Sequence, residues 1–483
     1  MEKTLKEKTT SALIWSFIDK FGQQIIYIAT GIVLGRILTP DDYGLVGSLV
    51  FFTAISTILV GSGYNRAILN KAELTQEELS TLFFYNVGMG VVIYILLFFG
   101  APYISLFYRE PLLTPLSRVL FLTTVFNSLL IVNGALLTKK MDLTSLAKAN
   151  LFSLFPASVV AILMAVNGFG VWSLVVQTVL FTLSKVVVLA YYSKWRPSLT
   201  FNNKILKELF PFSSKFMLTN LINTIFNNIY YVLIGRFYNP TQLGYYTQAN
   251  KYQDIPTGLI NNTFRAVSMP ILSEINQDKD RLKRILSKLI RTIAFIGFPV
   301  LLGMILIAKP LFILLITEKW LPSVPVFQTL CVAGLFVMFS SVLEETILSR
   351  GHSGKLLMVE VLKKIVLVAL IIATLNRGLI GLATGWAVSS LFSLLLSIYL
   401  TSTIVGYSFS NFLKDSLPYL AISSAFCIAA YFISLPITNN YLFIGFCMAF
   451  VGIFYLIVCR ICKLDAAMEI FKWTRDKVIS KKK

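Results

Sequence analysis

Long apolar runs recur along the chain, separated by short stretches that contain Gly, Pro or charged residues. A run of about 20 apolar residues is long enough to cross a bilayer as an α-helix. Hydropathy and breaker residues together predict about fourteen such spans. Their approximate limits are 12–35, 44–65, 80–107, 113–138, 146–166, 169–192, 209–235, 243–267, 286–308, 324–348, 356–375, 379–403, 413–434 and 440–461. The pattern predicts an all-α polytopic membrane protein.

The distribution of positive charge supports these spans. The chain carries 43 Lys and Arg against 23 Asp and Glu, a net charge of +20. If the N-terminus is cytoplasmic, most of the basic residues fall in cytoplasmic connections, as the positive-inside rule requires. Both termini are therefore expected in the cytoplasm, and the charge gives no reason to expect a nucleic acid partner.

The segment 35–44, at the end of the first span, recurs as the segment 235–244. Four residues keep one offset: Gly35, Arg36, Pro40 and Gly44 match Gly235, Arg236, Pro240 and Gly244. Weaker matches follow, so spans 1–6 and 7–12 are interpreted as two copies of one six-helix unit. Because each unit has an even number of spans, the copies should be parallel.

This duplication predicts the domain organisation. An N-terminal lobe covers residues 1–193 and a C-terminal lobe covers 209–403, with a polar cytoplasmic linker at 194–208. Spans 13 and 14, at 404–463, lie outside the duplication. A basic cytoplasmic tail at 464–483 ends the chain.

Polar side chains form stripes along several spans, where an ionised group is costly and therefore a functional candidate. They are Lys20, Gln23, Gln24 and Tyr27 in span 1, Asn220, Asn223 and Asn227 in span 7, and Lys251, Asn262 and Arg265 in span 8. In span 1, spacings of three, four and seven residues place these side chains on one helix face. We interpret the stripes as walls of one cavity. The alternative is that they join helices through hydrogen bonds.

Acidic residues also fall within or near the spans. They are Asp19, Asp254, Glu344 and Glu345. A glutamate that faces the cavity could bind a cation or a proton, and an ion pair with Lys363 or Lys251 is an equal alternative. Asp19 follows a different helix face from Lys20, so it is expected to pair with another helix.

Enzyme motifs are scarce. The stretch from Gly351 to Lys355 lacks the spacing of a phosphate-binding loop, and no HExxH, GxSxG or metal-ligand cluster occurs. Connections of about 15–20 residues at most are too short for a catalytic domain. The sequence therefore predicts no catalytic residue, no metal and no cofactor, and an enzyme such as a polysaccharide polymerase is the less favoured reading.

The span pattern, the two lobes and the segment from Gly35 to Gly44 resemble polysaccharide exporters and Wzx-type flippases of the multidrug/oligosaccharidyl-lipid/polysaccharide (MOP) superfamily, in the branch of colanic acid and teichuronic acid exporters. The resemblance implies a bacterial cytoplasmic-membrane protein that moves an undecaprenyl-pyrophosphate-linked oligosaccharide by alternating access. In the related lipid II flippase, a charged pair in span 1 and arginines in spans 2 and 8 line the cavity. That similarity assigns the same role to Asp19, Lys20, Arg66 and Arg265.

Together these observations predict two groups of substrate contacts. The pyrophosphate is expected at Lys20, Lys251, Arg265 and Arg66. The sugar is expected at Gln23, Gln24, Tyr27, Asn220, Asn223, Asn227 and Asn262. Asp19, Asp254, Glu344 and Glu345 are candidate coupling or ion-pair groups. Membrane lipids, a polysaccharide polymerase and glycosyltransferases are the other expected partners. A cation-coupled multidrug exporter of the same superfamily is the alternative function.

Overall fold

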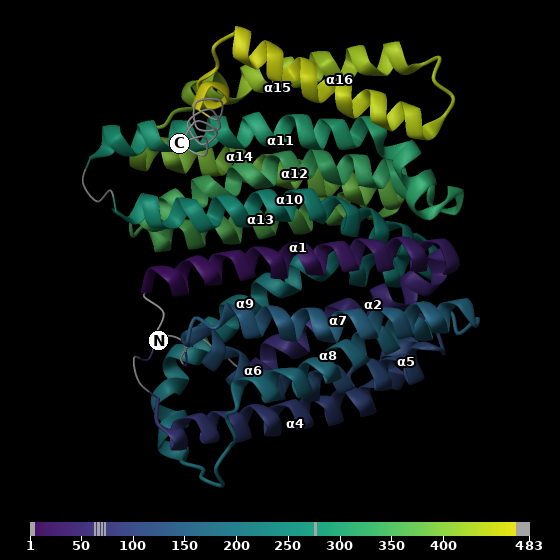
Figure 1. Cartoon of the computed structure of the whole chain (residues 1–483), viewed down its shortest axis with the longest axis vertical. Helices are drawn as coiled ribbons and strands as arrows, with labels where there is room; N and C mark the ends of the chain where they lie inside the picture. The colour runs from purple at the N-terminus through teal and green to yellow at the C-terminus, as the bar shows by residue number, and fades with distance from the viewer. Residues whose placement is uncertain are drawn as a thin grey trace. The chain divides into compact units, whose positions relative to one another are not determined.

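The computed structural model describes residues 5–61, 64, 68, 71, 74–274 and 278–469. These residues form helices joined by short connections, and no strand occurs among them (Figure 1). The long helices are α1 (Leu5–Ile37), α2 (Pro40–Gly61), α4 (Gln76–Tyr108), α5 (Leu113–Leu120), α6 (Leu122–Lys139), α7 (Leu143–Val166), α8 (Trp172–Ser193), α9 (Asn203–Phe237), α10 (Pro240–Glu274), α11 (Lys279–Ile316), α12 (Ser323–Ser349), α13 (Ser353–Thr374), α14 (Gly378–Val405), α15 (Phe409–Ser434) and α16 (Asn440–Ile461).

Each expected span falls on a helix, and the expected span 113–138 is covered by two helices, α5 and α6, which meet at Phe121. In the described part of the chain, nine helical segments are long and apolar enough to cross a membrane. They do not include α13, α14 or the three helices that carry the polar stripes, α1, α9 and α10. The all-helical membrane fold is therefore confirmed, and the number of about fourteen crossings stays a prediction.

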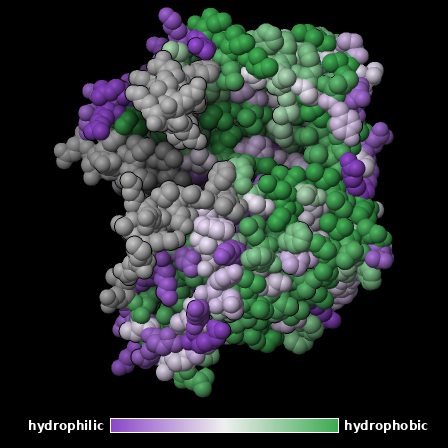
Figure 2. Space-filling model, viewed as in Figure 1, coloured by the Kyte–Doolittle hydropathy of each residue, from purple (hydrophilic) through white to green (hydrophobic). Residues whose placement is uncertain are grey.

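Large apolar side chains are exposed along the helices. On the face in Figure 2, hydrophobic residues cover wide areas of each unit and hydrophilic residues gather towards helix ends. Leu96 and Phe99 of α4 are 67% and 69% exposed, and Ile372 of α13 is 71% exposed. Soluble proteins rarely expose apolar surface of this extent, whereas lipid tails cover it at no cost.

The chain folds into two compact units, Met1–Thr247 and Gln248–Lys483. In the first unit α7 packs on α1 and α8, α6 packs on α4 and α8, and α9 packs on α2. In the second unit α12 packs on α14 and α11, and α11 also packs on α15 and α16. The unit boundary falls inside α10. The lobe limits drawn from the sequence repeat stay a prediction.

Helix caps explain why the repeated segment contains proline. Pro40 is the first residue of α2, and the Thr39 and Asp42 side chains cap it reciprocally: the Thr39 N–H donates to Asp42 at 2.8 Å, and the Asp42 N–H donates to Thr39 Oγ1 at 3.3 Å. Pro240 likewise begins α10, and the Asn239 side chain accepts from the Gln242 N–H at 2.9 Å. Proline suits this first helical position because its φ is preset and no N–H is lost.

The repeated glycines allow two helix starts to cross in close contact. A Cβ built on Gly44 would lie 1.8 Å from the carbonyl oxygen of Pro240, and a Cβ built on Gly244 would lie 1.9 Å from that of Pro40. The Thr241 hydroxyl also donates to the Asp41 carboxylate. The repeat therefore builds a reciprocal crossing of α2 and α10 within the first unit.

Candidate functional site

In the first unit, Asp19 joins α1 to α7. Its carboxylate accepts from the Gln23 amide on its own helix at 2.7 Å, and from the Asn150 amide of α7, whose nitrogen lies 3.1 Å from both carboxylate oxygens. A carboxylate within a membrane helix needs such donors, because lipid supplies none. The partner on another helix that the sequence predicts for Asp19 is thus Asn150.

The other polar residues of α1 are more open. Lys20 is exposed, Gln24 is half-buried, and Tyr27 is 39% exposed. Lys20 makes no ion pair among the residues that the structure describes. This face of α1 therefore presents one cation and two polar side chains.

Two asparagines of α9 bond to their own helix. The Asn220 amide donates to the Phe216 carbonyl at 2.9 Å, and the Asn228 amide donates to the Thr224 carbonyl at 2.9 Å. Asn223 is half-buried and Asn227 is exposed. Because these two bonds run four residues back along α9, they do not join α9 to a neighbour. That α9 contributes a cavity wall, and not a set of interhelical hydrogen bonds, stays a prediction.

In the second unit, α10 carries two cations in different settings. Lys251 is half-buried and makes no ion pair within the described ranges. Arg265 donates from Nε to Glu345 of α12 at 2.9 Å, and its Nη2 lies 2.8 Å from the same oxygen. The Arg265 side chain is 60% exposed, whereas the Glu345 side chain is only 7% exposed. The guanidinium is therefore anchored on one side and open on the other. Asp254 and Asn262 of α10 are exposed.

Glu344 belongs to a separate ionic cluster in the second unit. Its carboxylate accepts from the Lys363 ammonium of α13 and, at 3.3 Å, from the Ser397 hydroxyl of α14. Lys363 also lies 3.1 Å from Glu360, and its side chain is 11% exposed. The ion pair with Lys363 was one of two alternatives that the sequence leaves open. Glu344 and Glu345 are adjacent in sequence, but Glu344 pairs with α13 and Glu345 pairs with α10.

Two of the sequence predictions concern residues that the structure does not describe. Arg66, the proposed contact from span 2, and residues 470–483 of the predicted basic tail lie outside the described residues.

Asp415 of α15 is 3% exposed and accepts from Arg291 Nε at 2.6 Å and from the Tyr407 hydroxyl at 2.7 Å. Sequence reasoning missed Asp415 because it follows Lys414 near a span end, where a charge needs no special explanation.

No group of three or more His, Cys, Asp and Glu in the described ranges is arranged to hold a metal ion. The described helices do carry protonatable and cationic side chains. They suit binding of an anion and of a polar, hydroxyl-rich molecule.

Comparison with known proteins identifies the family. A family model described as "Polysaccharide biosynthesis protein" matches residues 33–325, which is more than half of the chain. The chain belongs to this family. The match includes the whole of segment 35–44 and its repeat at 235–244.

Individual relatives match over most of their length. The chain is 25% identical to the teichuronic acid biosynthesis protein TuaB of Bacillus subtilis (strain 168), over 89% of this chain and 90% of that protein. It is 24% identical to the lipopolysaccharide biosynthesis protein WzxC of Escherichia coli (strain K12), over 87% and 88%. The exporter resemblance predicted from the sequence is confirmed at the level of the family.

Solved structures share the fold. The lipid II flippase MurJ in an inward closed conformation matches with a TM-score of 0.74 and 16% identity, over 93% of this chain and 99% of that chain. An inward-facing multidrug resistance MATE family transporter of the MOP superfamily matches with a TM-score of 0.63 and 15% identity, over 85% and 98%. The predicted MOP-superfamily fold is thereby confirmed.

Proposed function

We propose that the protein moves a lipid-linked oligosaccharide, carried on undecaprenyl pyrophosphate, from the inner to the outer leaflet of the bacterial cytoplasmic membrane. The observation that carries the proposal is the set of exposed polar and cationic side chains on α1, α9 and α10. Such groups are too costly to face lipid, so they face a water-filled space. The names of relatives, teichuronic acid and lipopolysaccharide biosynthesis proteins, support a surface polysaccharide as the product.

The pyrophosphate is assigned to the cations. Lys20 and Lys251 have no ion-pair partner among the described residues, so their charge is available to an anion. Arg265 keeps part of its guanidinium open while Glu345 holds it in place. Guanidinium and ammonium groups form charge-assisted hydrogen bonds with phosphate oxygens, which are stronger than hydrogen bonds between neutral groups. Arg66 of span 2 is assigned to the same group by the family resemblance.

The sugars are assigned to neutral polar side chains. The amides of Gln23, Gln24, Asn220, Asn223, Asn227 and Asn262 and the hydroxyl of Tyr27 both donate and accept hydrogen bonds, as sugar hydroxyls do. Transport then proceeds by alternating access between lobes, with both termini in the cytoplasm. Glycosyltransferases must supply the substrate and a polymerase consumes it, so both are expected partners. The chain itself is expected to have no catalytic activity.

The alternative is a cation-coupled multidrug exporter, which the shared fold with a MATE family transporter supports. A site for cationic drugs requires available carboxylates. Here Asp19 already accepts from two amides, Glu344 from Lys363, and Glu345 from Arg265. Asp254 is the exposed acid of α10. The balance of available charge therefore favours an anionic substrate.

The test is export of surface polysaccharide by variants expressed at matched levels. We expect Lys251→Ala with Arg265→Ala to reduce export at least tenfold, and Lys309→Ala, an exposed lysine of α11 outside the stripes, to leave it unchanged. Export that is unaffected by the double variant contradicts the proposal. Drug resistance that rises with expression and is lost in Asp254→Asn supports the alternative.

A further inference from the structure

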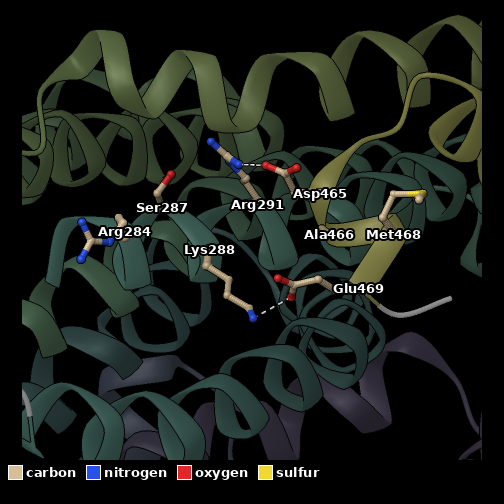
Figure 3. A pocket seen from close by; sticks show the side chains of 8 residues that line it. All are labelled: Arg284, Ser287, Lys288, Arg291, Asp465, Ala466, Met468 and Glu469. Atoms are coloured by element: carbon tan, nitrogen blue, oxygen red, sulfur yellow. Dashed lines mark hydrogen bonds and ion pairs between the residues drawn. The ribbon is translucent and has the colours of Figure 1, made fainter. Parts of the chain in front are cut away.

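A pocket of about 390 Å³ lies at the start of α11 in the second unit. Its lining comes from two segments: the first turns of α11, and the short helical segment 465–469 that follows α16 (Figure 3). The lining residues are Arg284, Ser287, Lys288, Arg291, Asp465, Ala466, Met468 and Glu469. None of the proposed substrate residues belongs to it.

The α11 side of the pocket is a cationic face. Arg284, Lys288 and Arg291 are separated by four and three residues, so they lie on one side of the helix. Just before them, the Asp278 side chain caps α11 by accepting from the Arg281 N–H at 2.9 Å, which holds the pKa of the Asp278 carboxyl below its ordinary value. The side-chain cap thus defines the start of α11, and the three cations follow on one face of the helix.

The facing segment supplies two carboxylates four residues apart. Asp465 pairs with Arg291, and Glu469 pairs with Lys288 at 2.7 Å. Figure 3 shows these two ion pairs side by side, with Arg284 beyond them. Arg284 makes no ion pair within the described part of the chain. Among the described residues, Arg284 is therefore the lining cation without an ion pair, whereas Lys288 and Arg291 are both paired.

Arg291 is held more firmly than Lys288, because it has a second acidic partner. Arg291 is also held from behind by Asp415, at 2.6 Å, and the Asp415 side chain is only 4% exposed. In the second pair, the side chains of Lys288 and Glu469 are 61% and 52% exposed. An exposed pair of this kind contributes little to stability. Glu469 can therefore be displaced from Lys288 while Arg291 stays in place.

The length of α11 indicates where the pocket lies relative to the bilayer. Its 38 residues span about 57 Å at 1.5 Å per residue. The hydrocarbon core of a bilayer is about 30 Å thick. The first turns of α11, with their charged residues, therefore extend into the headgroup region, where phosphate groups are abundant.

We propose that this pocket is a phosphate-binding site, in which a phosphate group bridges Arg284 and Lys288 and competes with Glu469. The phosphate belongs either to an anionic phospholipid headgroup or to a free phosphate compound. Binding releases Glu469, while Asp465 stays paired with Arg291 and the Ala466 N–H keeps its contact with the Tyr419 hydroxyl at 3.4 Å. The site is separate from the transport site, so its failure in experiment leaves the proposed function intact.

The experiment uses the full-length protein in detergent, and it measures thermal unfolding with increasing phosphatidylglycerol, phosphatidylcholine or inorganic pyrophosphate. We expect phosphatidylglycerol or pyrophosphate to raise Tm and phosphatidylcholine not to. Arg284→Ala with Lys288→Ala should weaken this response at least tenfold in apparent affinity. Glu469→Gln should strengthen it several-fold, because the competing carboxylate is gone.

The control is Arg281→Ala, which removes an exposed cation from the same helix outside the pocket. A response to phosphatidylglycerol alone assigns the lipid as source, and a response to pyrophosphate assigns a free phosphate compound. Equal weakening in Arg281→Ala and in the pocket variant, or no response to either probe, overturns the proposal. Unchanged or weaker binding in Glu469→Gln overturns the competition with that residue.

Discussion

Gly44 packs against the backbone carbonyl of Pro240 so closely that no side chain fits between α2 and α10. A Cβ at Gly44 would lie 1.8 Å from the Pro240 oxygen, and the reciprocal Cβ at Gly244 would lie 1.9 Å from the Pro40 oxygen. The neighbouring Gly47 continues the contact, since its Cβ would lie 2.7 Å from the Thr247 hydroxyl. The obstacle at Gly44 and Gly244 is backbone, which cannot turn away as a side chain can.

Gly44→Ala is therefore expected to destabilise the protein by about 1–3 kcal/mol, the usual cost of overpacking. Thermal unfolding of the purified protein in detergent measures this as a lower Tm. Gly88→Ala in α4 is the matched control, because a Cβ there meets nothing within 4 Å and alanine favours the helix. Equal Tm values for the two variants would show that the crossing is looser than described.

Asp19→Asn is expected to weaken the contact between α1 and α7 by about 1.5–3 kcal/mol, because two amide donors lose a charged acceptor. Combining it with Asn150→Asp exchanges donor and acceptor across the same contact. The double variant should recover most of the lost Tm. If it is less stable than either single variant, hydrogen bonding between positions 19 and 150 does not hold α1 on α7.

Lys363→Met is expected to lower stability by about 3 kcal/mol, because Glu344 and Glu360 both lose their shared cation in a site that is largely shielded. Adding Glu344→Gln should restore part of this loss, since one unpaired charge disappears. Thermal unfolding of the four combinations gives the interaction energy. Lys355→Met, an exposed lysine of the same helix, should cost little. Strictly additive losses would contradict the coupling.

Comparing Arg265→Ala with Glu345→Gln should distinguish an effect on transport from an effect on stability. Arg265→Ala removes a proposed pyrophosphate contact and leaves a nearly buried carboxylate unpaired, so both export and Tm should fall. Glu345→Gln keeps the guanidinium for the substrate, so Tm should fall while most of the export remains. Loss of export in both variants at equal folding would mean that the ion pair itself, and not the arginine, is required.

The apolar runs and the Gly/Pro segments determined the helices and their order. The spans follow from run length, because each helix satisfies its own backbone hydrogen bonds in lipid. Pro40 and Pro240, with Thr39 and Asn239 before them, begin α2 and α10 through contacts within three residues. Such local interactions can be read from the sequence, and so can the repeat and the polar stripes.

Only the tertiary structure decided which polar groups meet. Asn150 lies 131 residues from Asp19, and Glu345 lies 80 residues from Arg265. Adjacent glutamates, Glu344 and Glu345, pair with different helices because a turn of about 100° separates their side chains. The rotation of each helix about its axis decides which side chains face a neighbouring helix. It decides these ion pairs and the contact of Gly44 with Pro240. This rotation depends on packing along the whole helix.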